Sequence, residues 1–206
     1  MDREPNLIRR GRKYDQVLDG ARFVFLRDGF ERASVDDIAR EAGVSKATLY
    51  SYFPDKRLLF MEVAAIECKR QADEAEALID QAAPVAQVLR AAAEKIVAFM
   101  QSEFGRRVFR IAVAESETFP ALARDFYQCG PLLIRQRIAY LLRCAAERGE
   151  VAIDDFDLAA DQFTQLCKAD IHDRLIFGLA DCCTPRDVTR TIEAAVQMFM
   201  ARYATR

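Results

Sequence analysis

The stretch that decides the fold is Ser34-Val-Asp-Asp-Ile-Ala-Arg-Glu-Ala-Gly-Val-Ser-Lys-Ala-Thr-Leu-Tyr-Ser-Tyr-Phe53. Ser34 has Asp37 three residues later, which is the spacing of a capping box, and it begins a short helix that Gly43 ends. Ser45 then caps a second short helix that reaches about Phe53. The pattern predicts helices over residues 35–42 and 46–53, joined by the turn 43–45. This is the geometry of a helix-turn-helix, whose second helix enters the DNA major groove by its N-terminus.

The side chains of the second short helix divide into an inward and an outward set. Leu49 and Phe53 are four residues apart and are expected to hold the helix to the rest of its domain. The outward side chains are small or form hydrogen bonds, and a lysine adds a cation at the positive end of the helix dipole. Any one of them could be ordinary packing or solvated surface. Their order within two capped helices is much harder to obtain by chance.

Chemistry and reach give each outward residue an expected role. Lys46 and Thr48 can hydrogen-bond base edges, and the Ala47 methyl can contact a thymine methyl. The hydroxyls of Tyr50 and Tyr52 can donate to phosphate oxygens, which fixes the register without reading sequence. Ser34, whose hydroxyl and amides begin the first short helix, and Lys56 can contact the same phosphate backbone. The candidate DNA-binding residues are Ser34, Ser45, Lys46, Ala47, Thr48, Tyr50, Ser51, Tyr52 and Lys56.

The distribution of charge agrees with a nucleic-acid contact at the N-terminal end. Residues 1–60 hold 12 Lys and Arg against 10 Asp and Glu, whereas residues 61–206 hold 18 against 22. A basic first part on an acidic remainder indicates that the first part alone meets a polyanion. Arg9, Arg10, Arg12 and Lys13 are expected to follow the DNA backbone or to enter the minor groove.

The rest of the chain has helical periodicity nearly everywhere. A first helix over residues 12–28 stops at Gly29, and a helix over 56–82 would extend for about 40 Å, so it must join the first domain to the remainder. Further helices are expected over 84–103, 106–117, 121–128, 131–148, 157–179 and 185–203. We predict an all-α protein: a three-helix DNA-binding domain (residues 1–55) joined by a long helix to a helical effector-binding and dimerisation domain (residues 56–206).

The composition excludes several other classes of protein. No apolar run is long enough to span a bilayer and no secretory signal is apparent, so we expect a cytoplasmic protein with no membrane contact. The six cysteines form no Cys-x-x-Cys pair and share one histidine, so we expect no metal site and mostly buried thiols. Cys182 and Cys183 are the exception, because they lie in an expected loop where thiols can be exposed; whether they sense oxidants is left open.

Residues 12–60 resemble the N-terminal DNA-binding domain of TetR/AcrR-type transcriptional regulators. The resemblance is carried by Gly29-Phe30, Ser34, Ile38-Ala39, Ala42-Gly43-Val44-Ser45, Leu49-Tyr50, Tyr52-Phe53, Lys56 and Leu59-Phe60. It implies phosphate contacts for Tyr50, Tyr52 and Lys56, and base contacts for Lys46, Ala47 and Thr48. Ser34 stands where threonine is common in the family, and Ala47 where glycine is common. The Ala47 methyl lies at the closest approach to DNA and could change the base preference.

Residues 106–179 are similar to the C-terminal domains of the AefR-like subgroup. That resemblance implies a domain that binds a small effector and dimerises through its last two helices. An effector pocket would lie between the middle helices. The candidate ligand-binding residues are Phe99, Met100, Phe104, Phe109, Phe126, Tyr127 and Tyr140, although an aromatic stripe at helical spacing is more often plain core. His172, near Asp170 and Asp173, could be a polar contact in the pocket, or a solvated or interface histidine.

Apolar residues recur every three or four positions in the last helix and in the one before it, and two such helices with their symmetry mates would form a four-helix interface. A purely intramolecular stripe fits the pattern about equally well. We favour a homodimer because one helix-turn-helix reads too few bases. The candidate interface residues are Phe163, Cys167, Ile171, Leu175, Val188, Ile192, Val196 and Phe199.

These observations predict a ligand-responsive, dimeric transcriptional regulator that binds an approximately palindromic operator in double-stranded DNA. We expect a repressor that a small-molecule effector releases, with no cofactor; an activator with the same DNA chemistry is the alternative. A helical adaptor that binds protein is disfavoured by the basic first domain. An enzyme is disfavoured because the sequence has no Gly-rich phosphate loop and no Gly-x-Ser-x-Gly elbow. The sequence does not disclose the effector, the operator or the regulated genes.

Overall fold

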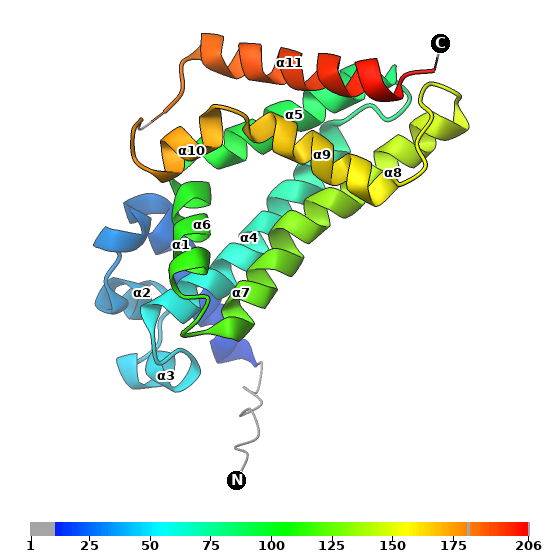
Figure 1. Ribbon diagram of the computed structural model, residues 1–206. Coiled ribbons are helices and arrows are strands. Elements are labelled where there is room, and N and C mark those ends of the chain that lie inside the picture. The colour runs from blue at the N-terminus through cyan, green and yellow to red at the C-terminus, as the bar shows by residue number, and fades with distance from the viewer. Residues whose placement is uncertain (1–10, 181, 206) are drawn as a thin grey trace. The chain divides into compact units, whose positions relative to one another are not determined.

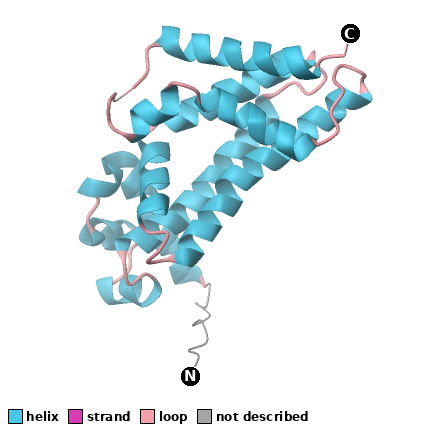
Figure 2. Ribbon diagram, viewed as in Figure 1, coloured by secondary structure: helices cyan, strands magenta, loops and turns pink. Residues whose placement is uncertain are grey.

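The computed structural model describes residues 11–180 and 182–205. Within these residues the chain is built from helices without a strand, and the only β-type pairing is an isolated bridge between Val151 and Ala204 (Figure 2). The predicted all-α class is confirmed. The chain divides into two compact units, Met1–Ile66 and Glu67–Arg206. No helix among the described residues combines the length and the apolar character needed to cross a bilayer.

The N-terminal unit contains α1 (Arg12–Arg32), α2 (Val35–Glu41), α3 (Lys46–Tyr52) and the start of α4 (Lys56–Leu78), which continues into the second unit (Figure 1). The apolar stripe of α1 is buried, and it meets apolar side chains from the other three helices. The fully or nearly fully buried set comprises Val17, Ala21, Val24, Phe25, Ile38, Leu49, Phe53, Leu59 and Phe60. This core fixes α2 and α3 against α1.

Gly29 interrupts α1, but the helix does not stop there. The glycine has φ 76° and ψ 166°, a conformation that residues with a Cβ rarely adopt, and α1 extends beyond it to Arg32. The interruption turns Phe30 back so that its ring lies 4.9 Å from the Phe60 ring centroid and 6.0 Å from that of Phe25. The predicted break was therefore correctly placed, although the helix continues past it for a turn.

A close approach between α1 and the end of α2 depends on a second glycine. A Cβ built on Gly20 would lie 2.6 Å from the backbone nitrogen of Ala42 and 2.8 Å from its Cα. Side chains essentially never come this close to backbone atoms, so the α1–α2 contact requires glycine at position 20. Ala42 directly precedes the turn that carries α3. Gly20 thus sets where that turn lies.

The C-terminal unit contains the rest of α4 and seven further α-helices: α5 (Val85–Gln101), α6 (Glu103–Ala114), α7 (Pro120–Tyr127), α8 (Leu133–Glu147), α9 (Phe156–Lys168), α10 (Ile171–Ile176) and α11 (Pro185–Tyr203). Helices α5, α8, α9 and α11 share one hydrophobic core. Thr184 begins α11 with a full capping box, in which Asp187 is the partner. Glu150 accepts a hydrogen bond of 2.6 Å from the backbone N–H of Val85 at the start of α5.

Several predicted helix boundaries in this unit are wrong. The helix expected over 56–82 ends at Leu78, and the one expected over 106–117 spans Glu103–Ala114. The expected helix over 157–179 breaks into α9 and α10 at Asp170, whose φ of 64° is the only positive value for a non-glycine residue in the described chain. The expected break at Gly130 and start at Pro131 are absent: a π-helical segment, Gln128–Leu132, joins α7 to α8 (Figure 1). A π-turn has an irregular hydrogen-bond ladder, so it tolerates the missing N–H of Pro131.

The six cysteines are free, and their exposure varies. Cys68 and Cys167 are buried, and burial raises the pKa of each thiol to about 12. Of the vicinal pair, Cys182 is exposed as expected, whereas Cys183 is buried, which raises its thiol pKa. Exposure of both neighbouring thiols was the wrong expectation, because Cys183 packs into the core of its unit.

Candidate functional site

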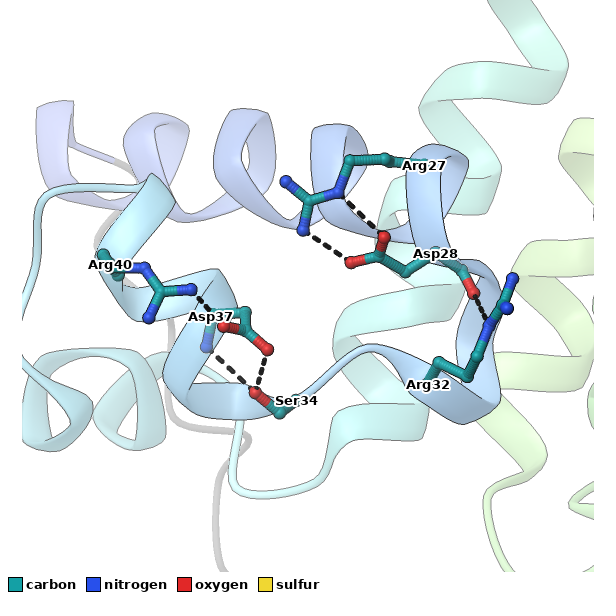
Figure 3. Close-up of polar contacts among 6 residues, drawn as sticks. All are labelled: Arg27, Asp28, Arg32, Ser34, Asp37 and Arg40. Atoms are coloured by element: carbon teal, nitrogen blue, oxygen red, sulfur yellow. Dashed lines mark hydrogen bonds and ion pairs between the residues drawn. The ribbon is translucent and has the colours of Figure 1, made fainter.

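The start of α2 is capped by Ser34 and its neighbours. The Ser34 Oγ accepts the backbone N–H of Asp37 at 3.0 Å and donates to the Asp37 carboxylate at 2.5 Å (Figure 3). The hydrogen bond from Ser34 lowers the pKa of that carboxyl group. Arg40 pairs with the other carboxylate oxygen of Asp37. In a full capping box the Asp37 carboxylate would accept the backbone N–H of Ser34. Here it accepts the Ser34 hydroxyl instead.

The turn between α2 and α3 depends on Gly43, which has φ 63° and no atom within 4 Å of a built Cβ. Glycine is therefore favoured at position 43 because the backbone has a positive φ, and not because a side chain would clash there. The backbone N–H of Val44 donates to the Ala39 carbonyl at 3.0 Å, which closes the end of α2. Ser45 then caps α3 by accepting the N–H of Thr48 at 3.1 Å. The predicted capped helix, glycine turn and capped helix are confirmed.

Helix α3 has one buried side and one exposed side. Leu49 is 1% exposed and Phe53, which ends the helix, is 5% exposed, as their spacing predicted. On the other side Lys46, Ala47 and Tyr50 are exposed. These three outward residues present an ammonium, a methyl and a phenol to solvent.

The remaining outward residues of α3 already have partners within the domain. Thr48 is half-buried, and its hydroxyl lies 2.9 Å from that of Ser45. Ser51 is exposed, and its hydroxyl donates to the Thr48 carbonyl at 2.6 Å. Tyr52 is half-buried, with its ring edge-on to Tyr14 at 5.6 Å. DNA contacts from the Thr48 and Ser51 hydroxyls would share or replace these hydrogen bonds within the domain.

Lys56 has a role in the fold that its sequence did not reveal. Its ammonium donates to the carbonyls of Phe30 at 2.9 Å and Ala33 at 3.1 Å, and lies 4.4 Å from the centroid of the Phe30 ring. Two of its three N–H bonds therefore close the end of α1. One N–H is left for a phosphate. Of the basic residues before α1, Arg9 and Arg10 lie outside the described residues, whereas Arg12 and Lys13 are exposed.

Asp36 is the residue at this site that sequence reasoning missed. Its carboxylate lies 2.5 Å from the ammonium of Lys46, so the second residue of α2 forms an ion pair with the first residue of α3. Both side chains are more than half exposed. The two residues are ten positions apart, a spacing that carries no signal until the turn is folded.

The candidate ligand-binding residues of the C-terminal unit lie on α5, α6, α7 and α8 and differ in exposure. Phe109 on α6 meets Phe126 on α7 edge-to-face at 6.3 Å, and it meets His172 on α10 at 4.9 Å. The rings of Phe99 and Phe104 meet edge-to-face with centroids 6.5 Å apart, and Met100 packs against the core of α5, α8, α9 and α11. Tyr127 and Tyr140 are half exposed and open to solvent.

The predicted dimer-interface residues belong to the core of a single chain. Seven of the eight are at most 6% exposed, and Val188 packs against the same core. Side chains buried in this way offer almost no surface to a partner, so the intramolecular alternative is correct for these residues. The exposed side of α9 carries Leu158, Gln162 and Gln165, and that of α11 carries Arg190, Ala194, Gln197, Met198 and Ala201. The apolar periodicity of these helices therefore reflects packing within their own unit.

The capped helix pair across a glycine turn, joined to a separate helical unit, defines a helix-turn-helix transcriptional regulator. Residues 17–63 match the model of the tetR family of bacterial regulatory proteins, and residues 87–205 match that of the AefR-like transcriptional repressor C-terminal domain. The second match alone covers more than half of the chain. The chain belongs to the TetR family of transcriptional regulators.

Solved structures agree with this assignment. The flavonoid-responsive regulator FrrA is 34% identical to this chain over 95% of its length and 99% of the length of FrrA, with a TM-score of 0.68. A TetR-family regulator from Mesorhizobium loti, 24% identical, shares the fold with a TM-score of 0.75 over 94% of this chain and 98% of its own.

Among curated relatives, the HTH-type transcriptional regulator Mb2274c of Mycobacterium bovis is 35% identical over 98 residues, which are 44% of this chain and 51% of that protein. The chain spans about half, or less, of the length of the first curated relatives that it matches.

Proposed function

We propose that this protein is a dimeric repressor that a small-molecule effector releases from its operator. The observation that carries the proposal is α3: a capped helix held by Leu49 whose exposed side offers Lys46, Ala47 and Tyr50. The repressor sense is supported by the AefR-like repressor match over the C-terminal unit. An activator would use the same DNA contacts, and transcription of the regulated genes after deletion distinguishes the two.

The proposed DNA contacts fall into two kinds. Lys46, Ala47 and Thr48 face base edges, while Tyr50 and Tyr52 contact phosphates, together with Ser34, Ser45, Ser51 and the remaining N–H of Lys56. In a dimer, two α3 helices about 34–36 Å apart would enter successive major grooves of an approximate palindrome. The test is a gel shift with the DNA that flanks the protein's own gene. Lys46→Met is expected to change sequence preference, and Tyr50→Phe to weaken all sequences alike. Unchanged binding by both variants would contradict the proposal.

We place the dimer contact on the exposed sides of α9 and α11 that the monomer core leaves free. Ala194, Gln197, Met198 and Ala201 recur at helical spacing and are uncharged, while Arg190, one turn earlier, pairs with Asp170. Met198 is 61% exposed. A charge inserted into this stripe should separate the protomers. Ala194→Arg is expected to give a monomer by sedimentation analysis, whereas Ala98→Arg, an exposed alanine on α5, should leave the dimer intact. If the Ala194→Arg variant remained a dimer, the proposed interface on α11 would be wrong.

For the effector we propose a planar aromatic compound that contacts Phe109, Phe126 and His172. These rings already meet edge-to-face, a geometry that an added aromatic ring can extend. FrrA, which is similar over nearly the whole chain, is named as flavonoid-responsive, and this supports the same ligand class. A ligand at 100 times its Kd stabilises a protein by about 2.7 kcal/mol. Thermal shifts with a flavonoid panel, lost in Phe109→Leu and kept in Tyr140→Phe, would support the site; equal shifts in both variants would contradict it.

A further inference from the structure

Lys46 carries the only charge on α3, and that charge is paired within the protein. The helix reads Lys-Ala-Thr-Leu-Tyr-Ser-Tyr, and its single cation contacts Asp36 at 2.5 Å. The ion pair of Arg40 with Asp37 joins residues three positions apart on α2. The Asp36–Lys46 pair instead joins the two helices of the helix-turn-helix. In the free protein, the positive charge on the exposed side of α3 is therefore offset by the Asp36 carboxylate.

The position of the pair makes it relevant to DNA recognition. Lys46 is the first residue of the helix that leads into the groove, and Asp36 is the second residue of the helix that crosses the backbone. An unpaired lysine at this point would be attracted to phosphates on every sequence. A carboxylate beside it opposes that attraction and competes for the ammonium. A guanine edge offers O6 and N7 as acceptors, which only some sequences present to Lys46.

We propose that Asp36 is a specificity-determining residue that competes with DNA phosphates for the Lys46 ammonium. On random DNA the ion pair persists for much of the time, so Lys46 adds little to sequence-independent affinity. On the operator, a base edge in reach takes the ammonium from Asp36. Because exposed ion pairs are individually weak, the effect is a several-fold change in affinity and not an all-or-none switch. This inference rests on the proposed DNA-binding function of α3.

The experiment measures binding of the full chain to a duplex of random sequence by fluorescence anisotropy between about 50 and 200 mM salt. The variants are Asp36→Asn, Lys46→Met and the double variant, with Glu41→Gln as the matched control because it removes an exposed acid from the far end of the same helix. One further neutralised phosphate steepens the plot of log K against log salt by about 0.9, which corresponds to about threefold in affinity across this range. Thermal unfolding of each variant verifies that it is folded.

Asp36→Asn is expected to tighten binding about threefold at the low-salt end and to steepen the salt dependence by up to about 0.9. The same substitution in the Lys46→Met background, and Glu41→Gln in the wild type, should change neither. Equal tightening in the Lys46→Met background would overturn the inference, because Asp36 would then act by plain repulsion of DNA. Wild-type affinity and slope for Asp36→Asn would overturn it as well. Failure of the wild type to bind any duplex would instead overturn the proposed function, and this inference with it.

Discussion

Replacing Gly20 by alanine should destabilise the protein, although the same change usually stabilises a helix. Alanine gains about 1 kcal/mol over glycine in a helix interior. Here the new Cβ would lie 2.6 Å from the Ala42 nitrogen, whereas ordinary contacts begin near 3.4 Å, so α1 and the end of α2 must separate by about 0.8 Å. The opposing atoms are backbone and cannot rotate away. Overpacking of this kind costs about 1–3 kcal/mol of stability, and we expect about 3 here because the opposing atoms are rigid backbone. After the gain of about 1 kcal/mol in helix propensity, the net loss in the free energy of unfolding is about 2 kcal/mol.

The assay for this prediction is thermal and denaturant unfolding of Gly20→Ala, with Gly130→Ala as the matched control. A Cβ on Gly130 meets only the Phe126 ring at 3.6 Å, an ordinary contact, so that variant should be neutral or slightly stabilised. A loss of about 2 kcal/mol lowers the Tm of a chain of this size by roughly 4–8 °C. DNA affinity should fall too, because the displaced segment carries α3. A Gly20→Ala protein as stable as wild type, with unchanged DNA affinity, would refute the described packing of α1 on α2.

Three further predictions concern the DNA contact, an acid-sensitive hydrogen bond and a helix cap. Tyr50→Phe should weaken binding to every duplex by about tenfold in anisotropy titrations, because a hydrogen bond to a charged group is worth about 1.5 kcal/mol, and should leave the Tm unchanged. The hydrogen bond from the Val85 N–H lowers the pKa of Glu150. The stability that this bond contributes is therefore present above the ordinary pKa of about 4.5 and is lost as pH falls through the lowered value. Glu150→Gln should make the free energy of unfolding less dependent on pH in the acid range, and an unchanged dependence would contradict this. Thr184→Ala should cost about 1 kcal/mol in denaturant unfolding by removing the cap of α11, and a loss below a few tenths would show that the cap contributes little.

Local sequence patterns predicted the helix-turn-helix well because each signal acts within a few residues. Ser34, Gly43 and Ser45 act on backbone groups one to three positions away, and the structure shows each of them in that role. The burial of Leu49 and Phe53 likewise follows from helical spacing on one short segment. The DNA roles of the outward residues remain predictions.

The sequence predictions failed at features that depend on contacts between distant segments of the folded chain. The apolar stripes of α9 and α11 were correctly found, but spacing alone does not say whether a stripe meets its own chain or a second copy. The ion pair of Asp36 with Lys46 and the bonds of Lys56 to two carbonyls join segments that only the folded chain brings together. The strained backbone at Asp170 and the π-segment around Pro131 depend on their surroundings, and no local rule marks them.

The most direct test of the central claim is selection of DNA from a randomised pool by the purified full chain at low ionic strength. If α3 enters the major groove from each protomer of a dimer, the pool should converge on two related half-sites whose centres are about 10 base pairs apart or a multiple of that spacing. Tyr50→Phe should select the same sequence with weaker retention. A pool that shows no enrichment after repeated rounds would contradict the assignment of α3 as a DNA-reading helix.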